Sequence, residues 1–245
     1  MSVCAIQSLL ILFLLGFYPC LDTLTCHKGI MLKFDNNLAI TPVEWFSLGT
    51  QKTDSREICQ ETLLLIDVGE RSVLVGSKGS SSAGAQDSRA VTIHSQGSGV
   101  VAASYVQYCS SDLCNEANSS SVLLESLPLP DFSPPGTLQC PVCLQFYGAC
   151  SRNSNFVFCP QNTRCYTADI HIDGGGLSTN FSADGCLALS TKSLFGNSDT
   201  IGIFSILEKH SDSLQDAAAR STWASLRLMT ILISQGPSTK NFHLI

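Results

Sequence analysis

The chain contains one stretch twice, and this duplication constrains its fold more than any other feature. The first copy spans residues 59–80 and the second spans residues 165–186. At a constant offset of 106 residues both copies begin with cysteine, and Asp67 coincides with Asp173. An offset that holds without a gap indicates two copies of one structural unit. Each copy has two aliphatic runs around an Asp/Gly turn, which predicts a β-hairpin.

The cysteines and the N-terminus favour an oxidising, extracellular environment. Twelve cysteines are typical of a disulfide-stapled exported protein. Residues 9–18 carry no charge and have the length of a signal-peptide core, which is too short to span a bilayer. We therefore predict a cleaved signal peptide over residues 1–23, with a buried helix as the alternative. Loss of Cys4 and Cys20 with the signal leaves ten cysteines, an even number.

The rest of the chain divides into two modules, a connector and a tail. The connector contains four prolines between residues 128 and 135, which predicts an extended, semi-stiff spacer, including its leucines at 123–129. Glycine and serine accumulate over residues 76–98 and predict a mobile loop, while residues 199–207 predict a last strand. The predicted boundaries are 24–118 for the first domain, 119–138 for the Pro/Ser-rich linker, 139–209 for the second domain and 210–245 for the tail.

The repeat selects one disulfide pattern among the many that ten cysteines permit. Where the second module has Cys159 and Cys186, the first has Thr53 and Ser80, so we expect this pair of cysteines to be bonded to each other. The complete prediction is Cys26–Cys59, Cys109–Cys114, Cys140–Cys165, Cys143–Cys150 and Cys159–Cys186. Because a bridge typically contributes about 2–4 kcal/mol, we predict that the first module is the less stable one.

The sequence offers weak evidence for other sites. Four cysteines (140, 143, 159 and 165) approach a zinc-ligand spacing, but the repeat favours disulfides. No histidine lies in a nucleophile or metal motif, so we predict no catalytic residue, no metal and no cofactor. His171 alternates with isoleucines and should face outward from a strand. Asn118 and Asn180 begin N-x-S triplets and are predicted N-glycosylation sites in an exported glycoprotein. A net charge of −6 disfavours binding to nucleic acid.

One motif resembles a known family. The first module ends in CSSDLCN (residues 109–115), and a two-module, cysteine-rich chain with this ending resembles the lymphocyte antigen 6/urokinase receptor family. The resemblance covers about residues 26–204. It implies an all-β fold of two small disulfide-rich, snake-toxin-like three-finger domains in tandem. Each domain would be a small sheet held by a disulfide knot, with three projecting loops.

The resemblance also implies a function. Family members mostly bind extracellular or membrane proteins, such as adhesion molecules, integrins and proteases, often on the outer face of the plasma membrane through a glycolipid (GPI) anchor. We therefore expect a non-catalytic adhesion or receptor molecule, secreted or at the cell surface, that binds through loop tips and an exposed sheet face. The alternative is a soluble inhibitor of a secreted phospholipase or protease.

Two features depart from the family pattern. The second module has no C-x4-C-N ending, and reads FSILEKHSD at residues 204–212 instead. The tail is atypical for a glycolipid signal, because its apolar stretch at residues 223–233 contains Arg227 and is followed by twelve mostly polar residues. An anchored tail and an untethered tail both remain open at this point.

Overall fold

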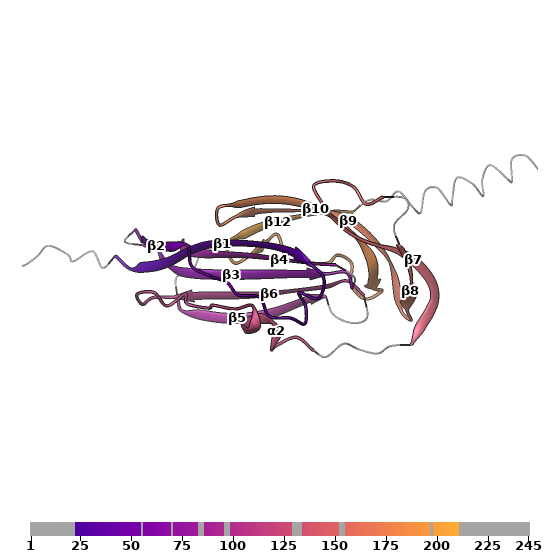
Figure 1. The fold of residues 1–245 in the computed structure, drawn as a ribbon, viewed down its shortest axis with the longest axis horizontal. Coiled ribbons are helices and arrows are strands. Elements are labelled where there is room, and N and C mark those ends of the chain that lie inside the picture. Colours follow the sequence, from indigo (N-terminus) through magenta and orange to yellow (C-terminus); the bar gives the residue numbers. More distant parts are fainter. Residues whose placement is uncertain are drawn as a thin grey trace, which may run out of the picture.

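The computed structural model describes residues 23–54, 56–69, 71–82, 86–95, 99–128, 134–151, 155–196 and 198–210. They form two six-stranded antiparallel sheets and one helix of a single turn (Figure 1). The predicted signal peptide and nearly all of the predicted tail lie outside these residues. Within them, no helix is long and apolar enough to span a membrane.

The first sheet has the strand order β2-β1-β4-β3-β6-β5. Three consecutive hairpin pairs build it, and the first strand of the chain pairs with the fourth through seven registered residue pairs. The strands are β1 (Thr25–Asp35), β2 (Gly49–Lys52), β3 (Ile58–Asp67), β4 (Ser72–Ser81), β5 (Ser88–Ser95) and β6 (Val101–Cys109).

The second sheet has the order β8-β7-β10-β9-β12-β11, which is the same order strand for strand. The duplication seen in the sequence is therefore a duplication of topology, and it extends well beyond the hairpin that revealed it. The strands are β7 (Pro135–Phe146), β8 (Asn155–Pro160), β9 (Thr163–Gly174), β10 (Leu177–Ala188), β11 (Thr200–Ile201) and β12 (Phe204–His210).

The repeated stretch forms the central hairpin of each sheet. In the first copy Cys59 faces Ser80 across β3 and β4, and in the second Cys165 faces Cys186 across β9 and β10. The β9–β10 turn needs glycine, since Gly175 and Gly176 have φ values of +58° and +82°. The predicted hairpins are confirmed.

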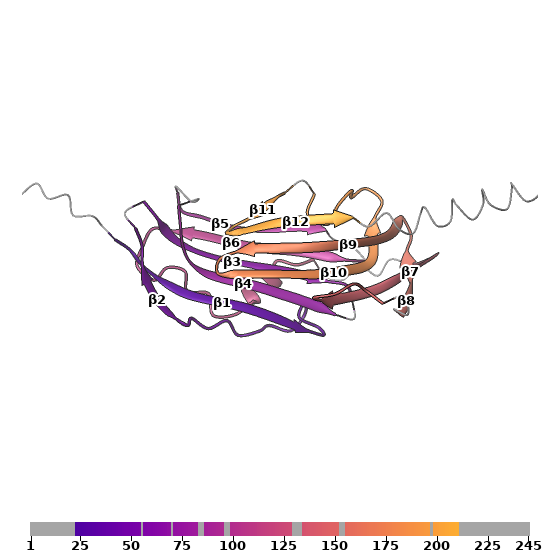
Figure 2. The ribbon, with the colours of Figure 1, turned by 90° about the horizontal axis from the view of Figure 1, so that it is seen from above.

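The sheets stack face to face and share one core. Figures 1 and 2 show β9, β10 and β12 lying over β1, β3, β4 and β6, while β7 and β8 bend away at one end. One continuous cluster of buried side chains joins the facing surfaces, with Leu64, Ile66 and Val75 from the first sheet and Ile170 and Phe181 from the second. We call the side of each sheet that points away from the other its outer face.

Three expectations from the sequence are wrong in detail. The connector is not extended throughout, because residues 121–124 form helix α2 (Ser121–Leu124), whose Leu123 is fully buried against the outer face of the first sheet. The Gly/Ser-rich stretch is largely ordered, because β4 and β5 pair within the sheet there. The last strand is a hairpin, because Gly202, at φ +57°, turns the chain between β11 and β12.

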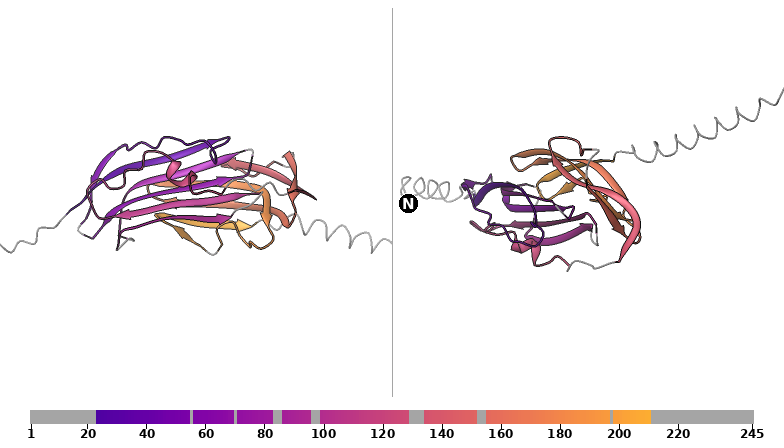
Figure 3. Two further views of the ribbon diagram at one scale, coloured as in Figure 1. Left: turned by 90° about the horizontal axis from the view of Figure 1, so that it is seen from below. Right: turned by 45° about the vertical axis from the view of Figure 1, so that its right-hand side comes forward.

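The reasons for these differences are tertiary. A single buried leucine outweighs the nearby prolines in the connector. Serine and glycine in β4 are held by neighbouring strands on both sides, so their low strand propensity is overridden. Figure 3 shows α2 on the side of the first sheet that is opposite the second sheet.

Candidate functional site

The outer face of the second sheet carries a field of polar side chains. On β9, buried Ile170 and Ile172 point into the shared core, so Asp169 and His171 alternate to the outer face, as predicted for His171. On β10, Asn180 stands opposite His171 in the pairing register. Four strands thus contribute to one contiguous surface, since β12 and β7 flank this central pair.

The field surrounds a shallow hollow of about 500 Å³. Neighbouring strands supply Ser182 opposite Asp169, and Leu207 and Lys209 from β12. The Ser182 hydroxyl lies within hydrogen-bond distance of the Gly148 carbonyl oxygen and of the Asp169 carboxylate, and can donate its one proton to either. The contact with Gly148 places the segment after β7 at the rim.

This geometry suits the binding of a polar ligand. Ser182 is hydrogen-bonded directly to Asp169 and not through His171, so the described residues do not form a Ser–His–Asp relay. Carboxylate, ammonium, imidazole and amide groups on one open surface can instead pair with the polar groups of a ligand.

An aromatic strip lies at the edge of the same sheet. Phe156 and Phe158 on β8 have 61% and 59% of their surface exposed. They stand opposite Pro141 and Gln139, out of step with Val157, which packs on the shared core. Both rings therefore belong to the outer side of β8. Exposed aromatic side chains are enriched at protein–protein interfaces.

The third outward residue of β10, Asp184, is covered by the Cys143–Cys150 bridge. Only 6% of Asp184 is exposed, and its Oδ1 has no hydrogen-bond partner among the described residues. Burial raises the pKa of this carboxyl, and a hydrogen bond from Thr167 partly offsets the rise.

Disulfides hold one end of each sheet. The structure pairs Cys26 with Cys59, Cys109 with Cys114, Cys140 with Cys165, Cys143 with Cys150 and Cys159 with Cys186, the same five pairs that the repeat selects. The four cysteines with a zinc-like spacing all lie in these bridges, so they offer no thiolate to a metal.

Hydrogen bonds occupy the place of the missing bridge in the first module. Ser80 Oγ donates to Glu57 Oε2 at 2.7 Å and accepts from Gln51 Nε2 at 2.9 Å. Thr53 is buried, and its Oγ1 accepts the backbone N–H of Leu24 at 2.8 Å. These polar contacts tie neighbouring segments together where the second module has Cys159 and Cys186.

The outer face of the first sheet is closed by the chain itself. The positions equivalent to Asp169, His171 and Asn180, which lie 106 residues earlier, are leucines 63, 65 and 74. All three are fully buried beneath Trp45 and Leu123. The sequence carried a signal for this difference between the faces, because the offset that aligns the two hairpins aligns a leucine of the first module with each of these polar residues of the second.

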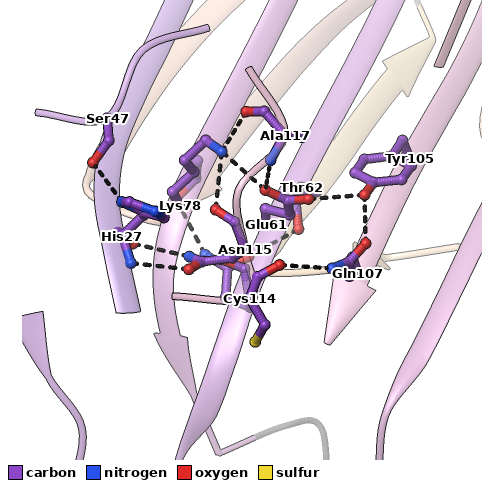
Figure 4. A network of polar contacts seen from close by, with 12 residues as sticks. His27, Ser47, Glu61, Thr62, Lys78, Tyr105, Gln107, Cys114, Asn115 and Ala117 are labelled. Atoms are coloured by element: carbon purple, nitrogen blue, oxygen red, sulfur yellow. Dashed lines mark hydrogen bonds and ion pairs between the residues drawn. The ribbon is translucent and has the colours of Figure 1, made fainter. Parts of the chain in front are cut away.

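A buried polar network completes this closure (Figure 4). Lys78 Nζ donates to Glu61 Oε2 at 2.9 Å and to the Asn115 carbonyl oxygen at 3.0 Å, and lies 4.3 Å from the centroid of the Trp45 ring. The Asn115 amide bonds both the N–H and the carbonyl oxygen of His27 at 2.9 Å. Burial lowers the pKa of Lys78, and Glu61 partly offsets the effect.

The two predicted glycosylation sites have different surroundings. Asn118 is exposed at the end of the first domain, where its carbonyl oxygen accepts the backbone N–H of Trp45 at 2.8 Å. Asn180 is exposed on β10 and borders the hollow.

Trp45, Lys78 and Glu61 were not singled out from the sequence, since nothing local identifies the partners of an isolated tryptophan or ion pair.

Comparison with known proteins identifies the family. A profile of the u-PAR/Ly-6 domain matches residues 136–214. The chain is 32% identical to human testis-expressed protein 101 over 189 residues, which is 75% of this chain and 74% of that protein. It is 50% identical to mouse CD177 antigen over 199 residues, 79% of this chain but 24% of that protein. The chain thus spans about a quarter of CD177 antigen.

A solved structure agrees with the sequence comparison. The crystal structure of mouse TEX101 matches with a TM-score of 0.65 at 26% identity, covering 76% of this chain and 97% of that one. The predicted fold class, two disulfide-rich three-finger domains in tandem, is confirmed by this match and by the two equivalent sheets. The chain belongs to the u-PAR/Ly-6 family.

Proposed function

We propose that this chain is a non-catalytic extracellular molecule, of the adhesion or receptor type, that binds a protein partner through the outer face of its second sheet. The observation that carries the proposal is the contrast between two equivalent surfaces. The chain covers one with its own Trp45 and Leu123, whereas the other keeps Asp169, His171 and Lys209 at an open hollow.

The composition of the open face supports a protein partner. Phe156 and Phe158 supply aromatic groups that a partner could bury, and a few such buried anchors carry most of the binding free energy of an interface. Charged groups of both signs at the hollow favour an orientation-specific contact. Five disulfides and family membership support a place outside the cell, either secreted or on the outer face of the plasma membrane.

The test is binding of the full chain, secreted from mammalian cells and presented multivalently, to a panel of purified extracellular domains. For a partner found in this way, replacing Phe156 and Phe158 together with alanine should weaken binding at least about tenfold, or 1.4 kcal/mol. The matched control replaces Phe46 and Leu48, an equally exposed apolar pair in the first module, and should leave the affinity unchanged.

Two outcomes would contradict the proposal. A loss of binding on replacing Phe46 and Leu48, with no effect of the pair on β8, would move the site to the first module. Inhibition of a secreted phospholipase or protease by the purified chain, sensitive to neither pair, would favour the inhibitor function instead.

A further inference from the structure

We propose that an N-linked glycan on Asn180 lies along the outer face of the second sheet, with its first sugars in the hollow, and thereby controls access to the binding face. The inference rests on the proposed function for its consequence, but not for its structural content. It gives the second sheet a cover made of carbohydrate where the first sheet has one made of protein.

The position of Asn180 is the first argument. Eight of the twelve residues of β10 are buried, yet this asparagine is exposed and borders the hollow. Its side chain leaves β10 beside His171, its partner in the strand register. A sugar attached to the side-chain amide therefore starts within the polar field rather than at a loop tip.

The chemistry of the hollow is the second argument. N-Acetylglucosamine presents an acetamido group and hydroxyls, which need both donors and acceptors. Asp169 offers a carboxylate, Lys209 an ammonium group and His171 an imidazole around the hollow. Its volume of about 500 Å³ falls within the roughly 300–1,000 Å³ of small-molecule sites.

Two apolar groups can contact the hydrophobic face of a sugar ring. Leu207 lines the hollow with 49% of its surface exposed. Tyr147 is 65% exposed and is held beside Asn180 by two hydrogen bonds. Its backbone N–H donates to the Asn180 carbonyl oxygen at 3.1 Å, and its hydroxyl donates to the Ser178 carbonyl oxygen at 3.3 Å. Tyr147 also has a φ of +48°, a left-handed conformation that is strained for a bulky residue.

The first test uses the full chain from mammalian cells and needs no binding partner. Glycopeptide mass spectrometry should find Asn180 occupied and its glycan largely oligomannose, because a glycan held against protein is poorly reached by processing enzymes. The control adds a sequon at the exposed β8–β9 turn with Gln161→Asn, which creates Asn-Asn-Thr, and that glycan should be fully processed.

A second measurement probes contact directly. Removing the glycan with Asn180→Gln should lower the Tm by about 2–4 °C. The same substitution should have no effect in a chain that already carries Tyr147→Ser and Leu207→Ser. Asn180→Gln is preferred to substitution of Ser182, because Ser182 holds the segment after β7. An unoccupied Asn180, or complete processing together with an unchanged Tm, would overturn the inference.

The binding consequence is tested last, with a partner identified through the aromatic strip at Phe156 and Phe158. Asn180→Gln should bind that partner at least about tenfold more tightly than the glycosylated chain. Unchanged affinity, with the glycan shown to contact the sheet, would overturn the control of access alone. If both the glycan-processing test and the Tm test failed, the effect of replacing Phe156 and Phe158 would still stand, so the two proposals fail independently.

Discussion

The two outer faces of this molecule have the same backbone arrangement but carry different side chains. Both are built from central hairpins in the same register, within sheets of the same strand order. On the first, leucines at 63, 65 and 74 lie beneath Trp45 and α2, whereas the second exposes Asp169, His171 and Asn180. The difference teaches that strand pairing and disulfides preserve the frame of a repeat, while the residues on one face are free to acquire opposite chemistry.

The modules also differ in how they hold their disulfide ends. The second uses Cys159–Cys186, and the first replaces that bridge with hydrogen bonds at Ser80 and Thr53. A covalent bridge acts mainly on the unfolded chain, whereas the Lys78–Glu61 network acts within the folded one. The weaker first module predicted from its missing bridge therefore stays a prediction, and the shared core couples both modules.

The largest expected effect comes from breaking the network that closes the first face. Lys78→Ala leaves Glu61 buried without its cation, and we expect the free energy of unfolding to fall by about 3–5 kcal/mol in urea titrations. Combining Lys78→Met with Glu61→Leu should recover part of this loss, because no buried charge remains, although the Ala117 N–H loses its acceptor on Glu61. An equal loss in the single and double variants would show that the ion pair is not what stabilises the closed face.

Exchanging the bridges tests the second contrast. Replacing Cys159 and Cys186 with serine should cost about 2–4 kcal/mol, measured by urea unfolding under non-reducing conditions. Thr53→Cys with Ser80→Cys should form a bridge in the first module. The bridge should raise the free energy of unfolding by less than the loss of Cys159–Cys186 lowers it, since both native side chains lose hydrogen bonds. Free thiols at 53 and 80 by mass spectrometry would show that the two modules are not equivalent there.

The contact between the modules gives an intermediate effect. Gly202 has φ +57°, and a Cβ there would lie 2.2 Å from Thr62 Oγ1 of the facing sheet. Gly202→Ala should cost about 1–3 kcal/mol, from overpacking and backbone strain. Gly196→Ala is the matched control, because its φ is +66° and a Cβ would meet nothing within 4 Å.

The same variants report on coupling. In a chain that carries Trp223→Phe, so that Trp45 is the remaining tryptophan, we expect fluorescence, which senses the first module, and circular dichroism, which senses both sheets, to give coincident unfolding curves. Separate transitions in the unmodified chain would contradict a shared core and would support an independently weaker first module.

The smallest effect concerns Asp184, which stands 106 residues after Lys78 and whose Oδ1 has no hydrogen-bond partner in the part of the chain that the structure describes. Its folded pKa is raised above the unfolded value, so the unfolded chain loses this proton first as the pH rises. The free energy of unfolding is therefore higher by this contribution below the unfolded pKa, where Asp184 is protonated in both states. The contribution is lost as the pH rises through the folded pKa. Asp184→Asn should therefore stabilise the chain at pH 7, and its advantage should shrink on acidification towards pH 4.

That pH dependence shows whether the ionised Asp184 carboxylate destabilises the folded chain or stabilises it. Thr167→Val removes the hydrogen bond that partly stabilises the Asp184 carboxylate, and should enlarge the loss of stability at pH 7. Destabilisation by Asp184→Asn at neutral pH would mean that the carboxylate has a role in the folded state.

By itself the sequence determined the frame of this protein. The fixed offset between Cys59 and Cys165 was sufficient to predict two equivalent hairpins and to assign the Cys159–Cys186 bridge, because repeated chain segments with the same turns form the same pairs. The motif at residues 109–115 indicated the family. All of these features are local in sequence or fixed by covalent bonds.

The tertiary structure alone decided which segments cover the apolar outer face of the first sheet. Nothing near Trp45 or Leu123 in the chain indicates that both lie on the same side of one sheet, because that contact joins segments nearly eighty residues apart. The prolines of the connector pointed to an extended spacer, and burial of Leu123 overrode them. Which surfaces remain open to a partner follows from packing, and packing depends on the whole chain at once.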